Sequence, residues 1–198
     1  MTRIIAGAAG SLALRVPDRG TRPTSDRVRE SLFGGLEASG VLDGARVLDL
    51  YAGSGALGLE AVSRGASSAD LVEKSAMAAN VTEHNARTVA RAVAPARIRV
   101  HRSSVDAFLR STSGRFDLVF LDPPYDLADD DLAGTLELVT AATDDGALVI
   151  VERAFRSPEP RTPPELAALR SKRYGDTALW WYERVADTTQ PDAPSQSR

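Results

Sequence analysis

The four consecutive residues Asp122-Pro123-Pro124-Tyr125 combine a carboxylate, two rigid backbone positions and an aromatic ring. The Asp122 carboxylate and the Pro123 carbonyl oxygen can both accept hydrogen bonds from the exocyclic NH2 of a nucleic-acid base, which steers the nitrogen toward tetrahedral geometry. Proline fixes the backbone angle φ, so the carbonyl stays in place, and the Tyr125 ring offers a surface on which an extruded base can stack. We therefore expect a catalytic site at these four residues, against the alternative of a rigid turn that only ends a strand.

A second motif, Gly53-Ser54-Gly55-Ala56-Leu57-Gly58, follows an apolar segment and opens a helical pattern. Backbone N–H groups and the helix dipole at such a turn point toward a bound ligand, and this context is typical of a nucleotide site. Glu73 ends the next predicted strand, where its carboxylate can accept hydrogen bonds from two ribose hydroxyls. These features predict a nucleotide-containing cofactor and leave its identity open.

Asp49, just before the glycine turn, distinguishes two candidate cofactors. A carboxylate there repels the pyrophosphate of a dinucleotide, whereas it can bind the positively charged amino-acid end of S-adenosyl-L-methionine. We therefore predict S-adenosyl-L-methionine, against the alternative that Asp49 is a capping or loop carboxylate. Ser104 is placed to touch the adenine edge or to cap the helix that it precedes. The expected cofactor-binding residues are Asp49, Tyr51, Ala52, Gly53, Ser54, Gly55, Gly58, Glu73, Lys74, Ser104, Val105 and Asp122.

The two motifs together predict methyl transfer to the amino nitrogen of a base. An in-line displacement moves positive charge onto that nitrogen, where Asp122 can stabilise it, and this reaction requires neither a covalent intermediate nor a metal. The chain contains no cysteine. Disulfides, thiolate metal sites and methylation at pyrimidine C5 are thereby excluded, because the last of these needs a thiolate nucleophile.

Charge is distributed unevenly along the chain, whose net charge is -3. Residues 1–30 contain six arginines against Asp18, Asp26 and Glu30, an excess of three positive charges. A basic end of this kind can contact phosphates or can simply be a solvated charged face. The sequence has no apolar run long enough to span a bilayer, and its start, MTRIIAGAAG, lacks the pattern of a secretory signal. We expect a cytoplasmic monomer.

Apolar segments alternate with helical patterns in the order of a parallel sheet that is covered on both faces. The predicted fold class is α/β: a Rossmann-like S-adenosylmethionine-dependent methyltransferase fold with a doubly wound, mostly parallel seven-stranded sheet. An antiparallel C-terminal hairpin and a small N-terminal β-hairpin plus helix complete it. Strands are expected at residues 3–7, 12–17, 45–51, 68–73, 96–101, 116–122, 146–152, 171–174 and 177–184. Helices are expected from a cap at Thr24 or Ser25 to 36, and at 56–65, 75–91, 105–111 and 129–142.

Residues 1–186 are expected to form a single methyltransferase domain. Within it, residues 1–37 form the N-terminal hairpin and helix, which we interpret as an RNA-binding extension. The segment 187–198, DTTQPDAPSQSR, has no apolar anchor and is predicted to be a disordered tail. His84 and His101 are interpreted as structural or solvated rather than catalytic.

Several segments together resemble the RsmD-type 16S ribosomal RNA guanine-N2 methyltransferases: RIIAG, RPTSDRVRESLF (22–33), LDLYAGSGALGLEAVSRGA, LVEKS, LDPPY and YGDTAL. The resemblance runs in unbroken order from about residue 3 to 183. It implies methyl transfer from S-adenosylmethionine to N2 of a guanine, of the 966 type, in 16S rRNA within the small ribosomal subunit or its assembly intermediate. It also implies that the substrate-binding residues include Arg3, Arg22, Thr24, Arg27 and Glu30. The sequence departs from the family pattern at GSLAL (10–14), which lacks arginines, and at Ser104, where a more strongly polar residue would bind adenine better.

Other functions are compatible with parts of the sequence. Adenine-N6 methylation of DNA or RNA uses the same amino-group geometry, although sequence-specific DNA enzymes usually need a larger target-reading region. A nicotinamide-dependent oxidoreductase shares the glycine turn but not Asp49 or residues 122–125. An RNA-binding protein with a decayed catalytic site is not expected to retain an intact DPPY.

Overall fold

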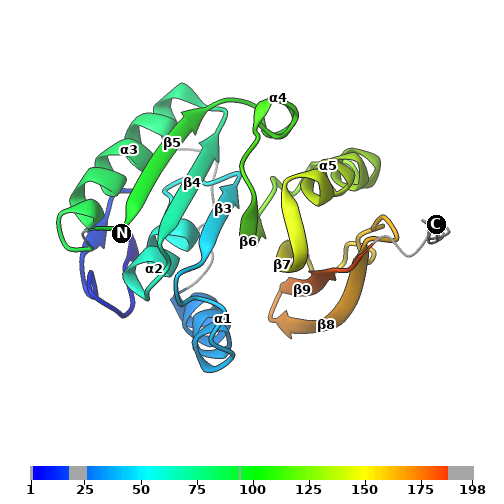
Figure 1. Ribbon diagram of the computed structural model, residues 1–198, viewed down its shortest axis with the longest axis horizontal. Helices are drawn as coiled ribbons and strands as arrows, with labels where there is room; N and C mark the ends of the chain where they lie inside the picture. Colours follow the sequence, from blue (N-terminus) through cyan, green and yellow to red (C-terminus); the bar gives the residue numbers. More distant parts are fainter. Residues whose placement is uncertain (1, 18–25, 94, 187–198) are drawn as a thin grey trace, which may run out of the picture.

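The computed structural model describes residues 2–17, 26–93 and 95–186 (Figure 1). Its main sheet has seven strands in the order β5-β4-β3-β6-β7-β9-β8. Strands β3 to β7 run parallel, whereas β9 lies antiparallel between β7 and β8. These strands are β3 (Arg46–Leu50), β4 (Ser68–Glu73), β5 (Arg97–Arg102), β6 (Phe116–Leu121), β7 (Thr143–Ala154), β8 (Leu166–Tyr174) and β9 (Thr177–Arg184). The predicted residues Arg22, Thr24 and Ser25 and the tail 187–198 lie outside the described residues.

Helices cover both faces of this sheet. In Figure 1 the strands fan from β5 on the left to β8 on the right, with α4 and α5 above and α1 below. One face carries α1 (Asp26–Ala38), α2 (Ala56–Ser63) and α3 (Ala76–Ala90), and the other carries α4 (Val105–Ser111) and α5 (Asp129–Ala141). Within the described part of the chain, no helix is both long and apolar enough to cross a membrane.

The central strands are buried on both sides. Successive side chains of a strand point to opposite faces, so Val47 joins the core beneath α1, α2 and α3, while Leu48 joins the core beneath α4 and α5. Both side chains are fully buried. This arrangement confirms the predicted doubly wound, mostly parallel seven-stranded sheet with an antiparallel C-terminal hairpin.

Strands β3 and β6 are neighbours at the centre of the sheet, and the chain winds away from them in opposite directions. Such a switch point opens a crevice at the carboxyl ends of the strands. The register pairs Leu50 with Leu121 on one side and with Val72 on the other. The residues that follow, Asp122 and Glu73 among them, therefore reach the same edge as the glycine turn.

The N-terminal hairpin is much shorter than the sequence predicts. Only β1 (Thr2–Arg3) and β2 (Ala13–Leu14) pair, instead of residues 3–7 with 12–17. The reason is that the backbone N–H groups of Ile5 and Ala6 donate to the Glu60 carboxylate, at 2.7 and 3.0 Å, rather than to a partner strand. A side chain from α2 thus replaces the second half of the expected ladder.

The C-terminal hairpin is longer than predicted because β8 begins at residue 166 rather than 171. Its pairing with β9 continues past an irregularity between Ala168 and Arg170. A bulge of this kind breaks the two-residue alternation that marks a strand in a sequence. The start of β8 at residue 166 therefore could not be predicted from the alternation of apolar and polar residues.

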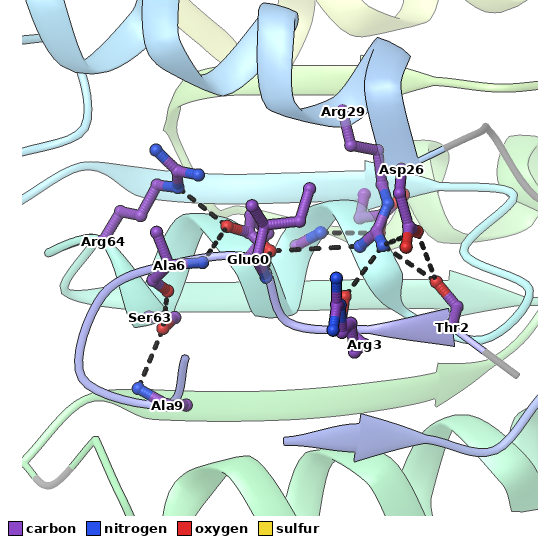
Figure 2. A network of polar contacts seen from close by, with 12 residues as sticks. Thr2, Arg3, Ala6, Ala9, Asp26, Arg29, Glu60, Ser63 and Arg64 are labelled. Carbon is purple, nitrogen blue, oxygen red and sulfur yellow. Dashed lines mark hydrogen bonds and ion pairs between the residues drawn. The ribbon is translucent and has the colours of Figure 1, made fainter. Parts of the chain in front are cut away.

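A buried polar network connects α1 and α2 to the N-terminal segment (Figure 2). Arg29 on α1 is fully buried, and its Nη2 atom donates to Thr2 Oγ1, the Arg3 carbonyl and Asp26 Oδ1 at 2.8, 2.7 and 2.7 Å. The bond from Arg29 lowers the pKa of Asp26. Arg29 Nη1 also lies 3.9 Å from the fully buried Glu60 carboxylate. Helix α1, which begins at Asp26 within the RPTSDRVRESLF block, is thereby connected to α2, the helix that begins at the glycine turn.

We expect Glu60→Gln to lower the free energy of unfolding by about 3 kcal/mol, because it removes the counter-charge of a buried arginine and one acceptor for backbone N–H groups. Urea unfolding at neutral pH measures this loss. Glu37→Gln is the control: Glu37 pairs with Arg64 at 2.7 Å but is 61% exposed, so its loss should be below about 1 kcal/mol. Equal losses in the two variants would show that the buried network does not hold the helices together.

Candidate functional site

The glycine turn after β3 is built from backbone conformations that favour glycine. Gly53 and Gly55 have φ values of 56° and 78°, and Tyr51 is one of the few other described residues with a positive φ, at 64°. The Gly55 N–H donates to the Ala52 carbonyl at 2.6 Å, and α2 begins at the next residue. The turn therefore presents backbone N–H groups and the start of a helix at the carboxyl edge.

Gly58 allows α2 to lie close against β3 and β4. A Cβ atom at this position would stand 2.3 Å from Leu71 Cδ2 and 3.1 Å from Asp49 Cβ. A side chain there would force the buried Leu71 side chain to move. The absence of a side chain also brings the Gly58 N–H within 2.9 Å of Asp49 Oδ2, to which it donates. Gly58 thus shapes the site through packing rather than through direct exposure to a ligand.

Asp49 is a carboxyl group in an apolar setting. It is 1% exposed. Burial raises its pKa to about 7, and the nearby Glu73 carboxylate acts in the same direction, while the Gly58 hydrogen bond opposes them. A carboxylate held in this way favours a positively charged partner, because a cation offsets the cost of ionising it.

Glu73 is fixed at the carboxyl end of β4. One of its oxygens accepts from the Gly53 N–H at 3.0 Å and the other from the Ser75 N–H at 2.7 Å. Each oxygen keeps a further lone-pair direction. The carboxylate is therefore oriented beside the glycine turn and retains capacity to accept hydroxyl hydrogens.

Two side chains of α3 support the turn, and neither was predicted from the sequence. Thr82 Oγ1 donates to the Gly53 carbonyl at 2.6 Å, and Asn85 Nδ2 donates to the Ser54 carbonyl at 2.9 Å. Asn85 also exchanges hydrogen bonds with the backbone of Arg15. Both are buried polar residues on the apolar face of a helix, three positions apart, and that pattern was the available signal.

Asp122 and the residues that follow it leave β6 beside the turn. Asp122 is half-buried, Pro123 is buried and Tyr125 is 58% exposed. The loop closes through a hydrogen bond from the Leu127 N–H to the Pro124 carbonyl at 3.0 Å. The tetrapeptide thus presents its carboxylate and its aromatic ring at the same edge as the glycine turn.

Arg153 holds the far end of this loop and was not singled out from the sequence. It extends from β7, is 5% exposed, and its Nη2 atom donates to the Leu127 carbonyl at 3.1 Å and to Asp129 Oδ1 at 2.9 Å. A buried guanidinium with these two partners ties the loop to the start of α5. A charged residue near the end of an apolar strand, GALVIVER, was the signal in the sequence.

The remaining predicted residues occupy diverse positions. Ser104 caps α4, its hydroxyl accepting from the Ala107 N–H at 3.3 Å, and the following Val105 is buried. Tyr51 is half-buried against the core beneath α4 and α5, and burial raises its pKa. The predicted residues that lie on the surface are Lys74, Arg3, Arg27 and Glu30. Arg27 and Glu30 lie in the first turns of α1, whereas Asp122 follows β6.

Asp49 makes stability depend on pH. Its pKa of about 7 in the folded chain exceeds its ordinary value of 3.8, so its contribution is fully present below about pH 4 and is lost as the pH rises through 7. Asp49→Asn keeps an oxygen for the Gly58 N–H and cannot ionise. Without added ligand, we expect the stability of the variant relative to the unaltered protein to grow by about 2 kcal/mol between pH 5 and pH 8.

Urea unfolding of both proteins at the two pH values measures this change. A relative stability that is the same at pH 5 and pH 8 would show that Asp49 does not titrate in this range.

Comparisons with known proteins agree with this geometry. Residues 2–183 match the family model described as Conserved hypothetical protein 95. The chain is 37% identical to ribosomal RNA small subunit methyltransferase D of Escherichia coli K12, over 93% of this chain and 90% of that protein. It is 31% identical to the putative rRNA methyltransferase YlbH of Bacillus subtilis, over 92% and 98%. The solved structure of the putative methyltransferase yhhF from Escherichia coli has a TM-score of 0.80 and 36% identity, over 93% and 98%. The family resemblance predicted from the sequence is confirmed: the chain belongs to the Conserved hypothetical protein 95 family, the RsmD family of methyltransferases.

Proposed function

We propose that the protein transfers a methyl group from S-adenosyl-L-methionine to the exocyclic N2 of a guanine in the 16S rRNA of the small ribosomal subunit. One observation carries the proposal: Asp49, the penultimate residue of β3, has a buried carboxyl, and the tetrapeptide that starts at Asp122 directly follows β6, the adjacent strand at the switch point of the sheet. This arrangement brings a site for a cationic nucleoside and a site for a base amino group to one edge.

The residues present fit the methyl donor. Asp49 receives its cationic amino-acid end, because a buried carboxylate with a raised pKa gains most from a positive partner. Glu73, preset beside Gly53, accepts from the ribose hydroxyls. The glycine turn, together with Ser104 and Val105 further along the edge, contacts the remaining parts of S-adenosylmethionine. When bound, S-adenosylmethionine supplies an electrophilic methyl group on a sulfonium. The full proposed set of cofactor-site residues is Asp49, Tyr51, Ala52, Gly53, Ser54, Gly55, Gly58, Glu73, Lys74, Ser104, Val105 and Asp122, with Gly58 contributing through its packing against β3 and β4.

The acceptor nitrogen is held by residues 122–125. The Asp122 carboxylate and the Pro123 carbonyl accept from the amino group, which turns its lone pair away from the base ring. As positive charge develops on the nitrogen, the Asp122 carboxylate stabilises it. The exposed Tyr125 ring stacks on the extruded base. Arg153 acts as a positioning residue, because its guanidinium donates to the Leu127 carbonyl of this loop and to Asp129 at the start of α5.

Membership of this family is the reason to favour guanine in ribosomal RNA over other bases as the substrate. The Escherichia coli relative is named a small-subunit ribosomal RNA methyltransferase, and the match covers nearly the whole of both chains. We further propose that Arg3, Arg22, Thr24, Arg27 and Glu30 contribute to substrate binding. The protein is proposed to act as a metal-independent cytoplasmic monomer, with residues 1–186 as one domain and 1–37 as its RNA-binding extension.

Asp122→Ala is expected to lower methyl transfer at least about 100-fold, because the acceptor for the amino group and for the developing charge is lost. Labelled S-adenosylmethionine with isolated small subunits measures transfer, and calorimetry measures cofactor affinity, which should fall far less than transfer because Asp122 is only one of the proposed cofactor contacts. Asp126→Ala, four residues further along the same loop and exposed, is the control and should transfer normally. Unchanged transfer by the Asp122 variant would remove this residue from catalysis.

The methylated nucleoside identifies the reaction. Small subunits, protein-free 16S rRNA and DNA are offered in parallel, and the product is hydrolysed to nucleosides. We expect N2-methylguanosine in the RNA. N6-methyladenine in DNA or RNA would establish the alternative function, because the geometry at residues 122–125 accepts either amino group.

A further inference from the structure

Three cations on the outer strand β8 lack a carboxylate partner. Arg170, Lys172 and Arg173 are exposed, and no described Asp or Glu forms an ion pair with any of them. Strand β8 contains no acidic residue. A chain of negative net charge therefore carries a local positive surface at one end of its sheet.

The first two of these cations point toward α1. In an antiparallel pair, directly opposite residues share a face, and Arg170 and Lys172 lie opposite Trp181 and Leu179, which belong to the core beneath α1. The Arg170 guanidinium stacks over Trp181 at 4.4 Å, and Lys172 Nζ lies 4.9 Å from the centre of the Tyr174 ring. Aromatic stacking holds both side chains in place without neutralising their charge.

The adjoining surface of α1 is formed by Ser31, Gly34 and Gly35, which have small side chains or none and carry no charge. Ser31 Oγ lies 2.9 Å from the Tyr174 hydroxyl and 3.3 Å from Lys172 Nζ. One turn further along, a Cβ atom at Gly34 would meet nothing within 4 Å, and one at Gly35 would meet only Arg170 Nη2, at 3.6 Å. Glycine weakens a helix, so a glycine pair on an exposed face leaves room for an extended ligand to approach the cations.

The cations of β8 lie level with the proposed catalytic residues along the strands of the sheet. The pairings Leu121–Val151, Val151–Trp180 and Trp180–Ser171 form one row across the sheet. Lys172 is thus level with the start of the DPPY tetrapeptide and three strand spacings away, about 14 Å. That separation is within reach of the nucleotides next to a base bound at Asp122.

Helix α1 extends the surface toward the carboxyl edge. Ser31 contacts Tyr174 at the tip of the hairpin, while Gly35 lies beside Arg170, further down the strand. The N-terminal turn of α1 therefore points toward the edge. Arg27, exposed and one turn before Ser31, continues the positive surface in that direction. Acidic groups at its margin are Glu30 on α1 and Asp176 in the hairpin turn.

We propose that the β8–α1 surface, defined by Arg27, Ser31, Arg170, Lys172 and Tyr174, binds the sugar-phosphate backbone of the RNA that flanks the target nucleotide. The inference rests on the proposed function and assigns it a direction: the RNA leaves the catalytic residues across β7 and β9 toward β8. Basic side chains on an outer strand also discourage pairing with other sheets. Protection of the strand edge, however, does not require Lys172 to lie level with Asp122, and it does not require small residues on the adjoining face of α1.

The test replaces Arg170 and Lys172 together by glutamine. Arg97→Gln with Arg99→Gln is the matched control, because these exposed arginines lie on β5, the opposite outer strand of the same sheet, and the change in net charge is identical. Affinity for a fluorescent 16S rRNA fragment and for small subunits is measured across a salt series. Methyl transfer, cofactor affinity and thermal unfolding are followed in parallel.

We expect the β8 variant to bind RNA about tenfold more weakly and to lower the slope of log K against log salt by about 1.4, for two lost phosphate contacts. Cofactor affinity should not change. Arg170→Lys with Lys172→Arg keeps both charges and should restore RNA affinity, which separates charge from a packing defect. Equal effects of the β8 and β5 variants would overturn the proposal.

Three other outcomes are equally decisive. Loss of affinity for small subunits without loss for the protein-free fragment would assign the surface to a ribosomal protein and overturn the RNA contact. If the unaltered protein methylates no RNA, the proposed function itself fails. If it methylates RNA while the β8 variant binds and transfers normally, only this inference fails.

Discussion

The hydrogen bond between the Gly58 N–H and the buried Asp49 carboxyl is the contact on which the candidate site depends. It holds α2 against β3 at a distance that favours glycine, since a side chain at Gly58 would overlap Leu71 unless Leu71 moved. This close approach sets where the turn between β3 and α2 can run. It also buries a carboxyl group that prefers to be neutral when no cation is near. The fold therefore accepts a local destabilisation where a charged ligand would be received.

Hydrogen bonds between a side chain and the backbone of another segment occur repeatedly around the site. Glu73 accepts from the turn, and Thr82 and Asn85 donate to it. Glu60 accepts from the N-terminal segment, and Arg153 donates to the loop after β6. Irregular backbone needs such partners when it is buried. The loops that carry the chemistry are consequently held by contacts from regular elements rather than by their own conformational preference.

Charge along the chain is a poor guide to charge on the surface. Arg29 belongs to the basic N-terminal segment, yet it is fully buried and neutralised by Asp26 and Glu60. By contrast, Arg170 and Lys172 belong to the remainder of the chain, which is acidic overall, yet both lie at the surface without an ion pair to a described carboxylate. A guanidinium can serve as a structural donor or as a contact for phosphate, and only its surroundings decide between these roles.

The sequence by itself determined the fold class, the order of the elements and the two motifs at the carboxyl edge, because apolar periodicity and glycine-rich turns are local properties of the chain. Strand β4 was predicted at its observed bounds, 68–73. Only the tertiary structure decided the roles of Glu60, Asn85 and Arg153, whose partners lie far away in the sequence. It also shortened the N-terminal hairpin and extended β8 beyond a bulge. These features depend on pairing between distant segments, and such pairing follows from packing, which no local pattern encodes.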